Sequence, residues 1–167
     1  MNTLQSILVP VDGSSASLSA LDHAVTLARD YGARVEVFHI MPVEDSLTEE
    51  ARAEVQKAMD SAVQRAKREL GDRLAMIQHT GDPLVEIVRQ AQQDHVDLIV
   101  MGTHGRIGRL HELLGGSVAE GVVRNAPCPV LTVRDKTGGY QSFADSRRYD
   151  RPPLAEQGAA SDQPRSR

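Results

Sequence analysis

The sequence is poor in cysteine and in aromatic residues. Its 167 residues include a single cysteine, Cys128, and no tryptophan, and all aromatic residues together make up 3% of the chain. One cysteine excludes an internal disulfide and a zinc site built on cysteines. Few rings are available to stack on bases, and the formal net charge is −4. The composition therefore argues against a protein that binds DNA or RNA.

Long apolar runs are also missing. No stretch of the sequence has the length of a membrane span, and no basic segment precedes the first apolar residues, as it would in a signal peptide. We therefore expect a cytoplasmic protein that makes no contact with a membrane.

The remaining composition is typical of one globular domain, with 40% hydrophobic and 25% charged residues. The character changes near residue 136, after which glycine, proline, serine and charged residues dominate. Such a segment has too few apolar groups to offset the entropy of ordering the chain. We expect a folded domain over residues 1–135 and a disordered tail over residues 136–167. Arg147 and Arg148 would suit an acidic partner, but nearby acidic residues balance them and favour a solvated tail.

Short apolar runs alternate with segments that have helical spacing of apolar residues. Strands are predicted at residues 6–11, 34–40, 73–80, 96–101 and 130–133. The fourth run is unbroken, as in a strand covered on both faces, whereas the third is more polar and suits an edge of the sheet. Alternation of strand and helix predicts an α/β fold with a Rossmann-like, doubly wound parallel sheet of five strands.

Capping residues predict where the helices begin and end. Gly32 should stop the first helix, and Asp82 followed by Pro83 should start the third. Capping boxes at Ser46-x-x-Glu49 and Ser117-x-x-Glu120 predict the starts of the second and last helices. The last helix should direct five apolar residues inward: Val118, Ala119, Val122, Val123 and Ala126.

A glycine-rich loop joins the fourth strand to the last helix. Glycines tolerate positive φ and leave backbone N–H groups uncovered, so that these groups can converge on an oxygen-rich ligand. The N-terminus of the helix that follows adds about half a positive charge. The same glycines would also suit a tight turn that binds nothing, and the loop by itself does not decide between the two.

The spacing Gly102-x2-Gly105-x9-Gly115, followed by Gly116 and Ser117, resembles the nucleotide-binding signature of the universal stress protein family. In that signature, serine or threonine follows the third glycine. If Gly115 is the third glycine, Gly116 takes the place of that residue; if Gly116 and Ser117 are the pair, the loop is one residue longer. The capping box favours the second register. The resemblance extends over residues 3–134 and includes residues 7–14 and 126–133.

The resemblance implies a site for an adenine nucleotide, ATP together with Mg²⁺, where the first and fourth strands end side by side. The end of the second strand would contact the adenine. Asp12 would bond the ribose or hold a metal ion through water, although it could instead cap the first helix. The family also implies a homodimer through the last strand. The predicted nucleotide-binding residues are Pro10, Val11, Asp12, Ile40, Met101, Gly102, His104, Gly105, Gly115, Gly116, Ser117 and Val118.

Other polar residues carry weaker predictions. His104 could donate to a phosphate or be solvated, and Arg106 and Arg109 could neutralise phosphate charge or point into solvent. His39 and His79 are predicted to be packed or surface residues, because no second histidine or cysteine stands at metal-ligand spacing.

Familiar enzyme motifs are missing from the sequence. No lysine lies between Lys67 and Lys136, which excludes a P-loop, and neither a dinucleotide-binding Gly-x-Gly-x2-Gly nor an esterase Gly-x-Ser-x-Gly is present. Together with these absences, the resemblance to the universal stress protein family implies an ATP-binding regulatory protein of the stress response. The alternatives are a nucleotide-free dimeric interaction protein and, last, a slow ATPase, since no residue stands out as the base that would position water.

Overall fold

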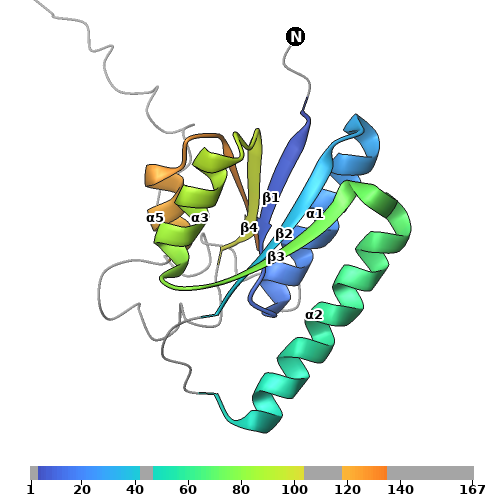
Figure 1. Cartoon of the computed structure of the whole chain (residues 1–167), viewed down its shortest axis with the longest axis vertical. Coiled ribbons are helices and arrows are strands. Elements are labelled where there is room, and N and C mark those ends of the chain that lie inside the picture. The colour runs from blue at the N-terminus through green and yellow to red at the C-terminus, as the bar shows by residue number, and fades with distance from the viewer. Residues whose placement is uncertain (1–3, 42–46, 104–117, 135–167) are drawn as a thin grey trace, which may run out of the picture. The chain divides into compact units, whose positions relative to one another are not determined.

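The computed structural model describes residues 4–41, 47–103 and 118–134, in which strands and helices alternate along the chain (Figure 1). In chain order, the elements are β1 (Ser6–Pro10), α1 (Ser15–Tyr31), β2 (Arg34–Met41), α2 (Glu49–Leu70), a short 3-10 helix (Gly71–Arg73), β3 (Leu74–Thr80), α3 (Pro83–Gln93), β4 (Leu98–Gly102), α5 (Val118–Asn125) and β5 (Val130–Val133).

The five strands form one parallel sheet with the order β3-β2-β1-β4-β5. The chain winds outward from β1 to β3 and then returns to the centre and winds the other way through β4 to β5. Helices α1 and α2 cover one face of the sheet, and α3 and α5 cover the other (Figure 1). The predicted doubly wound fold is confirmed, as are the central pair β1 and β4 and the edge position of β3.

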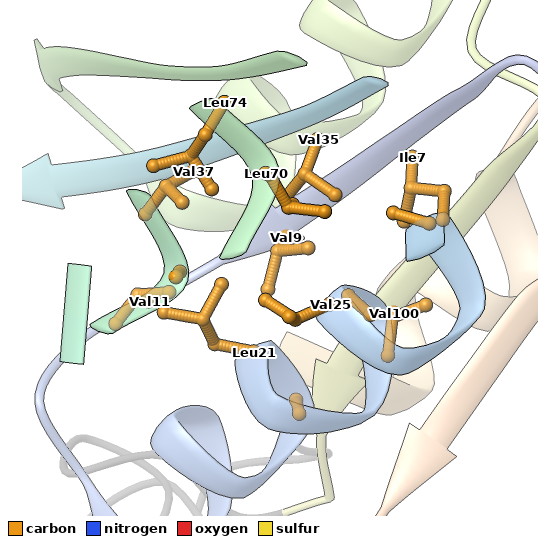
Figure 2. Close-up of a cluster of buried hydrophobic side chains, with 14 of the residues drawn as sticks. Ile7, Val9, Val11, Leu21, Val25, Val35, Val37, Leu70, Leu74 and Val100 are labelled. Atoms are coloured by element: carbon orange, nitrogen blue, oxygen red, sulfur yellow. The ribbon is translucent and has the colours of Figure 1, made fainter. Parts of the chain in front are cut away.

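Two apolar clusters hold the helices on the sheet. Alternate residues of β1 serve the two faces, because side chains of a strand point to opposite sides in turn. Ile7 and Val9 pack under α1 and α2, where Figure 2 shows them beside Leu21 and Val25, whereas Leu8 packs on the α3 and α5 side. All five side chains are at most 5% exposed. The central strand is therefore buried on both faces.

Several predicted boundaries differ from the structure. β1 ends at Pro10, before Val11, and β4 begins at Leu98, although Val96 is buried as expected. Helix α2 begins later than the predicted capping box requires, because the side chain of Thr48 accepts from Ala51 N and caps the helix there. Ser46 itself lies outside the described residues. Two acidic residues follow Thr48 in the first turn, where the helix dipole favours them.

The last helix has a narrower apolar face than predicted. Ala119 and Val122 are buried, and Val118 and Ala126 pack against the same cluster, but Val123 is 53% exposed. The prediction that Val123 faces inward is wrong, since a helix this short presents only one narrow stripe to the sheet. None of the helices in the described ranges has the length and apolar composition needed to cross a bilayer.

Asp97 ties the amino ends of β1 and β4 together. Its Oδ2 accepts from Gln5 N and Ser6 N, both at 2.9 Å, and from Ser6 Oγ at 3.3 Å. These donors stabilise the ionised carboxylate, and the backbone N–H groups of Gln5 and Ser6 lower the pKa of Asp97. These bonds join the two central strands at their amino-terminal ends.

We expect Asp97→Asn to lower the free energy of unfolding by about 1 kcal/mol at neutral pH, the usual net worth of a hydrogen bond. Because folding lowers the pKa of this acid, its contribution is present above the unfolded pKa and is lost as pH falls through the folded pKa. Urea unfolding of both proteins at decreasing pH should show the difference closing. Asp72→Asn, which changes an exposed aspartate, is the control. If the difference in free energy of unfolding between the parent protein and Asp97→Asn stays constant with pH, the assignment is contradicted.

Two glycines allow close contacts between elements. A Cβ on Gly102 would lie 2.9 Å from the backbone carbon of Ala16 and 2.9 Å from the backbone nitrogen of Ser17. A Cβ on Gly121 would lie 2.8 Å from Leu84 Cδ2, at the tip of a half-buried side chain. The first contact is with rigid backbone, whereas the second is with a side chain that can turn away.

Alanine at these two positions should therefore have unequal effects. We expect Gly102→Ala to destabilise the fold by about 1 to 3 kcal/mol through overpacking of α1 against β4. Gly121→Ala should change the stability by less than about 1 kcal/mol, because better helix propensity offsets the displacement of Leu84. Urea unfolding of the two variants tests this, and equal losses would show that the α1 contact has no special rigidity.

Candidate functional site

The candidate site lies where β1 and β4 end side by side. Both strands are parallel, so their carboxyl ends meet at the same edge, at the point where the winding direction of the sheet reverses. Asp12 and Gly13 lie between β1 and α1 there, while Gly102 ends β4 and Thr103 follows it. Gly102 approaches Ser17 of α1 directly. The two segments, about ninety residues apart in the sequence, thus adjoin through the first turn of α1.

Reciprocal hydrogen bonds shape the turn between β1 and α1. Ser14 caps α1, its Oγ accepting from Ser17 N at 3.2 Å and donating to Asp12 Oδ1 at 2.6 Å. Asp12 Oδ1 also accepts from Ser14 N at 3.0 Å. In return, Ser17 Oγ accepts from Asp12 N at 3.3 Å and donates to Ser14 O at 2.9 Å. The carboxylate of Asp12 therefore does not cap α1 itself but orients the serine that does.

Strand β2 holds the residue before this turn. The backbone N–H of Val11 donates to Phe38 O at 2.8 Å. The carbonyl of Val11 accepts from His39 Nδ1 at 2.7 Å, and the Val11 side chain is buried in the core. Both backbone groups of Val11 therefore bond to β2, so Val11 shapes the site mainly through the direction it gives to Asp12.

Helix α2 closes on the turn from a third side. Gly13 has φ of 79°, a conformation that favours glycine, and a Cβ there would lie 2.5 Å from Val55 Cγ1. Val55 belongs to the amino-terminal half of α2 and packs against the core. The turn that carries Asp12 is thus enclosed by α1, α2 and β2.

The other predicted site residues in the described ranges lie close to this edge. Pro10 ends β1 and is buried, and Ile40 and Met101 are 8% and 5% exposed in the cluster beneath α3 and α5. Val118 is the first residue of α5 and packs against the same cluster. The apolar Ile40, Met101 and Val118 therefore lie on the α3 and α5 side of the sheet, and the polar Asp12 and Ser14 lie on the α1 side.

Part of the predicted site falls outside the described residues. This applies to His104, Gly105, Gly115, Gly116 and Ser117, and also to the two loop arginines, Arg106 and Arg109. Helix α5 is described from Val118 onward, and its predicted cap, Ser117, is among the residues outside the description.

His79 forms a polar group with two residues of α3. Its Nδ1 lies 3.2 Å from Glu86 Oε2, which also bonds Arg89, and its ring packs edge-on against Phe38 with centroids 5.2 Å apart. Glu86 is 7% exposed, and the histidine and arginine satisfy it. His79 is therefore partly packed against Phe38 and partly exposed, with a side chain that is 38% accessible. In the described ranges, no cluster of three or more histidine, cysteine, aspartate or glutamate side chains could hold a metal.

A second polar group links β2 to the end of α3. Gln90 Nε2 donates to Glu36 Oε1 at 2.8 Å and to Asp94 Oδ2 at 2.7 Å. Burial raises the pKa of Glu36, the bond from Gln90 lowers it, and the charge of Asp94 raises it further. Burial also raises the pKa of the Cys128 thiol, which disfavours the reactive thiolate. Glu36 lies within β2, and Cys128 lies in the bend between α5 and β5, beside Ile99.

Sequence patterns identified Asp12 and the residues near it but not what holds them. Ser17 carried no signal beyond its place in the first helix, and the contact of Val55 with Gly13 joins segments that are distant in the chain. His39 was assigned a packed or surface role, and its bond to Val11 spans 28 residues. Such contacts follow only from the fold.

Comparison with known proteins agrees with these features. A model of the universal stress protein family matches residues 3–134. A universal stress protein of Methanocaldococcus jannaschii is 38% identical over 144 residues, which cover 80% of this chain and 84% of the relative.

Two solved structures of universal stress proteins are also similar. One, in complex with cAMP, is 27% identical with a TM-score of 0.64 and covers 80% of this chain and 99% of its own. The other, from Archaeoglobus fulgidus in complex with dAMP, is 27% identical with a TM-score of 0.58 and covers 79% and 99%. The family model, the sequence identity and the similar fold agree, and the chain belongs to the universal stress protein family.

Proposed function

We propose that this protein is a regulatory stress-response protein that binds an adenine nucleotide, ATP with Mg²⁺, at the carboxyl edge of β1 and β4. The observation that carries the proposal is the meeting of the Asp12 turn with the end of β4 at the reversal of the sheet, the place where ligands bind in such folds. The complexes of two similar proteins with cAMP and dAMP support an adenine nucleotide as the ligand.

Each side of the site would serve a different part of the nucleotide. The apolar side chains of Ile40 and Met101 suit the adenine ring, and the carboxylate of Asp12 suits the ribose hydroxyls or a metal ion held through water. We assign the phosphates to backbone N–H groups of the loop over residues 104–117, in the way that glycine-rich loops and helix N-termini bind anions. The output would be a bound state that a partner reads.

A dimer is part of the proposal. β5 lies at the edge of the sheet, next to β4, and its Leu131 is 40% exposed. An exposed strand edge with apolar side chains favours pairing with a second strand. We propose a homodimer through β5, as the family resemblance implies. A nucleotide-free dimer is the competing function. Slow hydrolysis of ATP ranks last because, among the residues that the structure describes near Asp12, none stands out as a base for water.

Binding should raise the melting temperature. Ligand at one hundred times its dissociation constant stabilises a folded protein by about 2.7 kcal/mol, so millimolar ATP with Mg²⁺ should give a clear shift in thermal unfolding. Gly105→Val should abolish the shift and leave the fold intact, because the new side chain would cover the phosphate-binding backbone. Gly121→Ala, at a position of α5 that faces Leu84 of α3, is the control and should keep the shift. A parent protein free of nucleotide that shows no shift would refute the proposal.

The register of the loop can be tested with three variants. If the helix start decides the register, Gly116 and Ser117 present N–H groups to the phosphates, and Gly115 accommodates the extra residue. Gly116→Ala should then weaken ATP more than Gly115→Ala does. Ser117→Ala should cost about 1 kcal/mol of stability through the lost cap and weaken ATP only modestly. Calorimetric titration decides, and a greater loss at Gly115 would establish the nine-residue register instead.

A further inference from the structure

His39 interrupts an otherwise apolar face of β2. Val35 and Val37, which point to the same side, are 1% and 0% exposed beneath α1 and α2, whereas the next residue on that side is a half-buried histidine. A further valine or leucine would continue the pattern without the cost of burying a polar ring. The imidazole therefore has a task that an apolar side chain could not perform.

That task is visible at the end of β1. Regular pairing of β1 with β2 ends at Pro10 opposite Phe38, yet Val11 is still bonded to β2 through both of its backbone groups. Its N–H donates to the backbone of Phe38 at 2.8 Å, and its carbonyl accepts from His39 Nδ1 at 2.7 Å. The imidazole thus extends the hydrogen bonding between β2 and β1 to Val11, the residue before Asp12.

The bond also defines the protonation of the ring. A carbonyl oxygen can only accept, so Nδ1 must carry the proton, and in the neutral ring Nε2 is then the acceptor. The direction of the chain after Val11 determines where the Asp12 carboxylate meets Ser14 Oγ, 2.6 Å away, and hence the geometry of the whole turn.

We propose that His39 is a positioning residue of the nucleotide site, which acts through the carbonyl of Val11 to hold the Asp12 turn in its binding geometry. The inference rests on the proposed function, because it concerns affinity for the same nucleotide. It assigns to β2 a second role besides the contact of Ile40 with the base. In this proposal, the effect of His39 on binding passes through its bond to the carbonyl of Val11.

Two substitutions separate the donor from the bulk of the side chain. His39→Asn keeps an N–H donor at about the same distance from the backbone as Nδ1, and His39→Leu keeps apolar bulk but has no donor. His23 offers a matched control, because its Nδ1 also bonds a backbone carbonyl, that of Ser19 at 2.8 Å, on the exposed side of α1. His23→Leu removes the same type of bond at a place remote from the turn.

The first measurement is the affinity for ATP with Mg²⁺ by calorimetry, well below the melting temperature of each variant. We expect His39→Leu to weaken binding about tenfold, equivalent to about 1.4 kcal/mol, and His39→Asn to remain within about threefold of the parent. His23→Leu should bind as the parent does. Parent-like affinity in His39→Leu, or an equal loss in His39→Leu and His39→Asn, would overturn the proposal.

The second measurement is amide hydrogen exchange of the nucleotide-free proteins by NMR. In His39→Leu, the N–H groups of Ser14 and Ser17 should exchange faster, while Val37, within the strand, should keep its protection. Unchanged protection at Ser14 and Ser17 would overturn the proposal whatever the affinities. If the parent protein binds no nucleotide, the proposed function fails, and exchange alone then decides whether His39 holds the turn.

Discussion

Burial of β1 on both faces and pairing along both of its edges is the constraint on which the structure depends. β2 and β4 flank the strand, and apolar side chains of α1 and α2 on one face and of α3 and α5 on the other enclose it. The chain leaves β1 at its carboxyl end, and because β1 and β4 are parallel neighbours, that end lies beside the carboxyl end of β4. The candidate site is therefore a direct consequence of the strand order.

What distinguishes this site from a simple turn is how tightly its polar residues are held. Ser14 and Ser17 bond Asp12 from α1, Val55 packs on Gly13 from α2, and β2 binds Val11 through backbone and side chain. A ligand that meets a turn held in this way loses little free energy to ordering it. The backbone of α1 also packs closely against Gly102, which links the turn to the end of β4.

The sequence predicted the fold well because its signals are local. Unbroken or alternating apolar runs indicated the strands, and Gly32 and Asp82 end and begin helices as expected. One error came from neighbouring signals: Ser46 and Thr48 are both good capping residues in the sequence, and the structure shows Thr48 as the cap. Val123 looked apolar enough to be buried, but the helix turns it outward. The roles of His39 and Val55 depend on contacts between distant segments, which no pattern in the sequence encodes.

The location of the nucleotide is the central claim, and backbone NMR of the labelled protein with and without ATP and Mg²⁺ tests it most directly. The account predicts changes in chemical shift that cluster at residues 10–17, at Ile40, at residues 101–105 and at residues 115–118. No change is expected near Asp97, at the opposite, amino-terminal ends of the strands. Changes centred elsewhere, or no changes at saturating ATP in protein free of bound nucleotide, would contradict it.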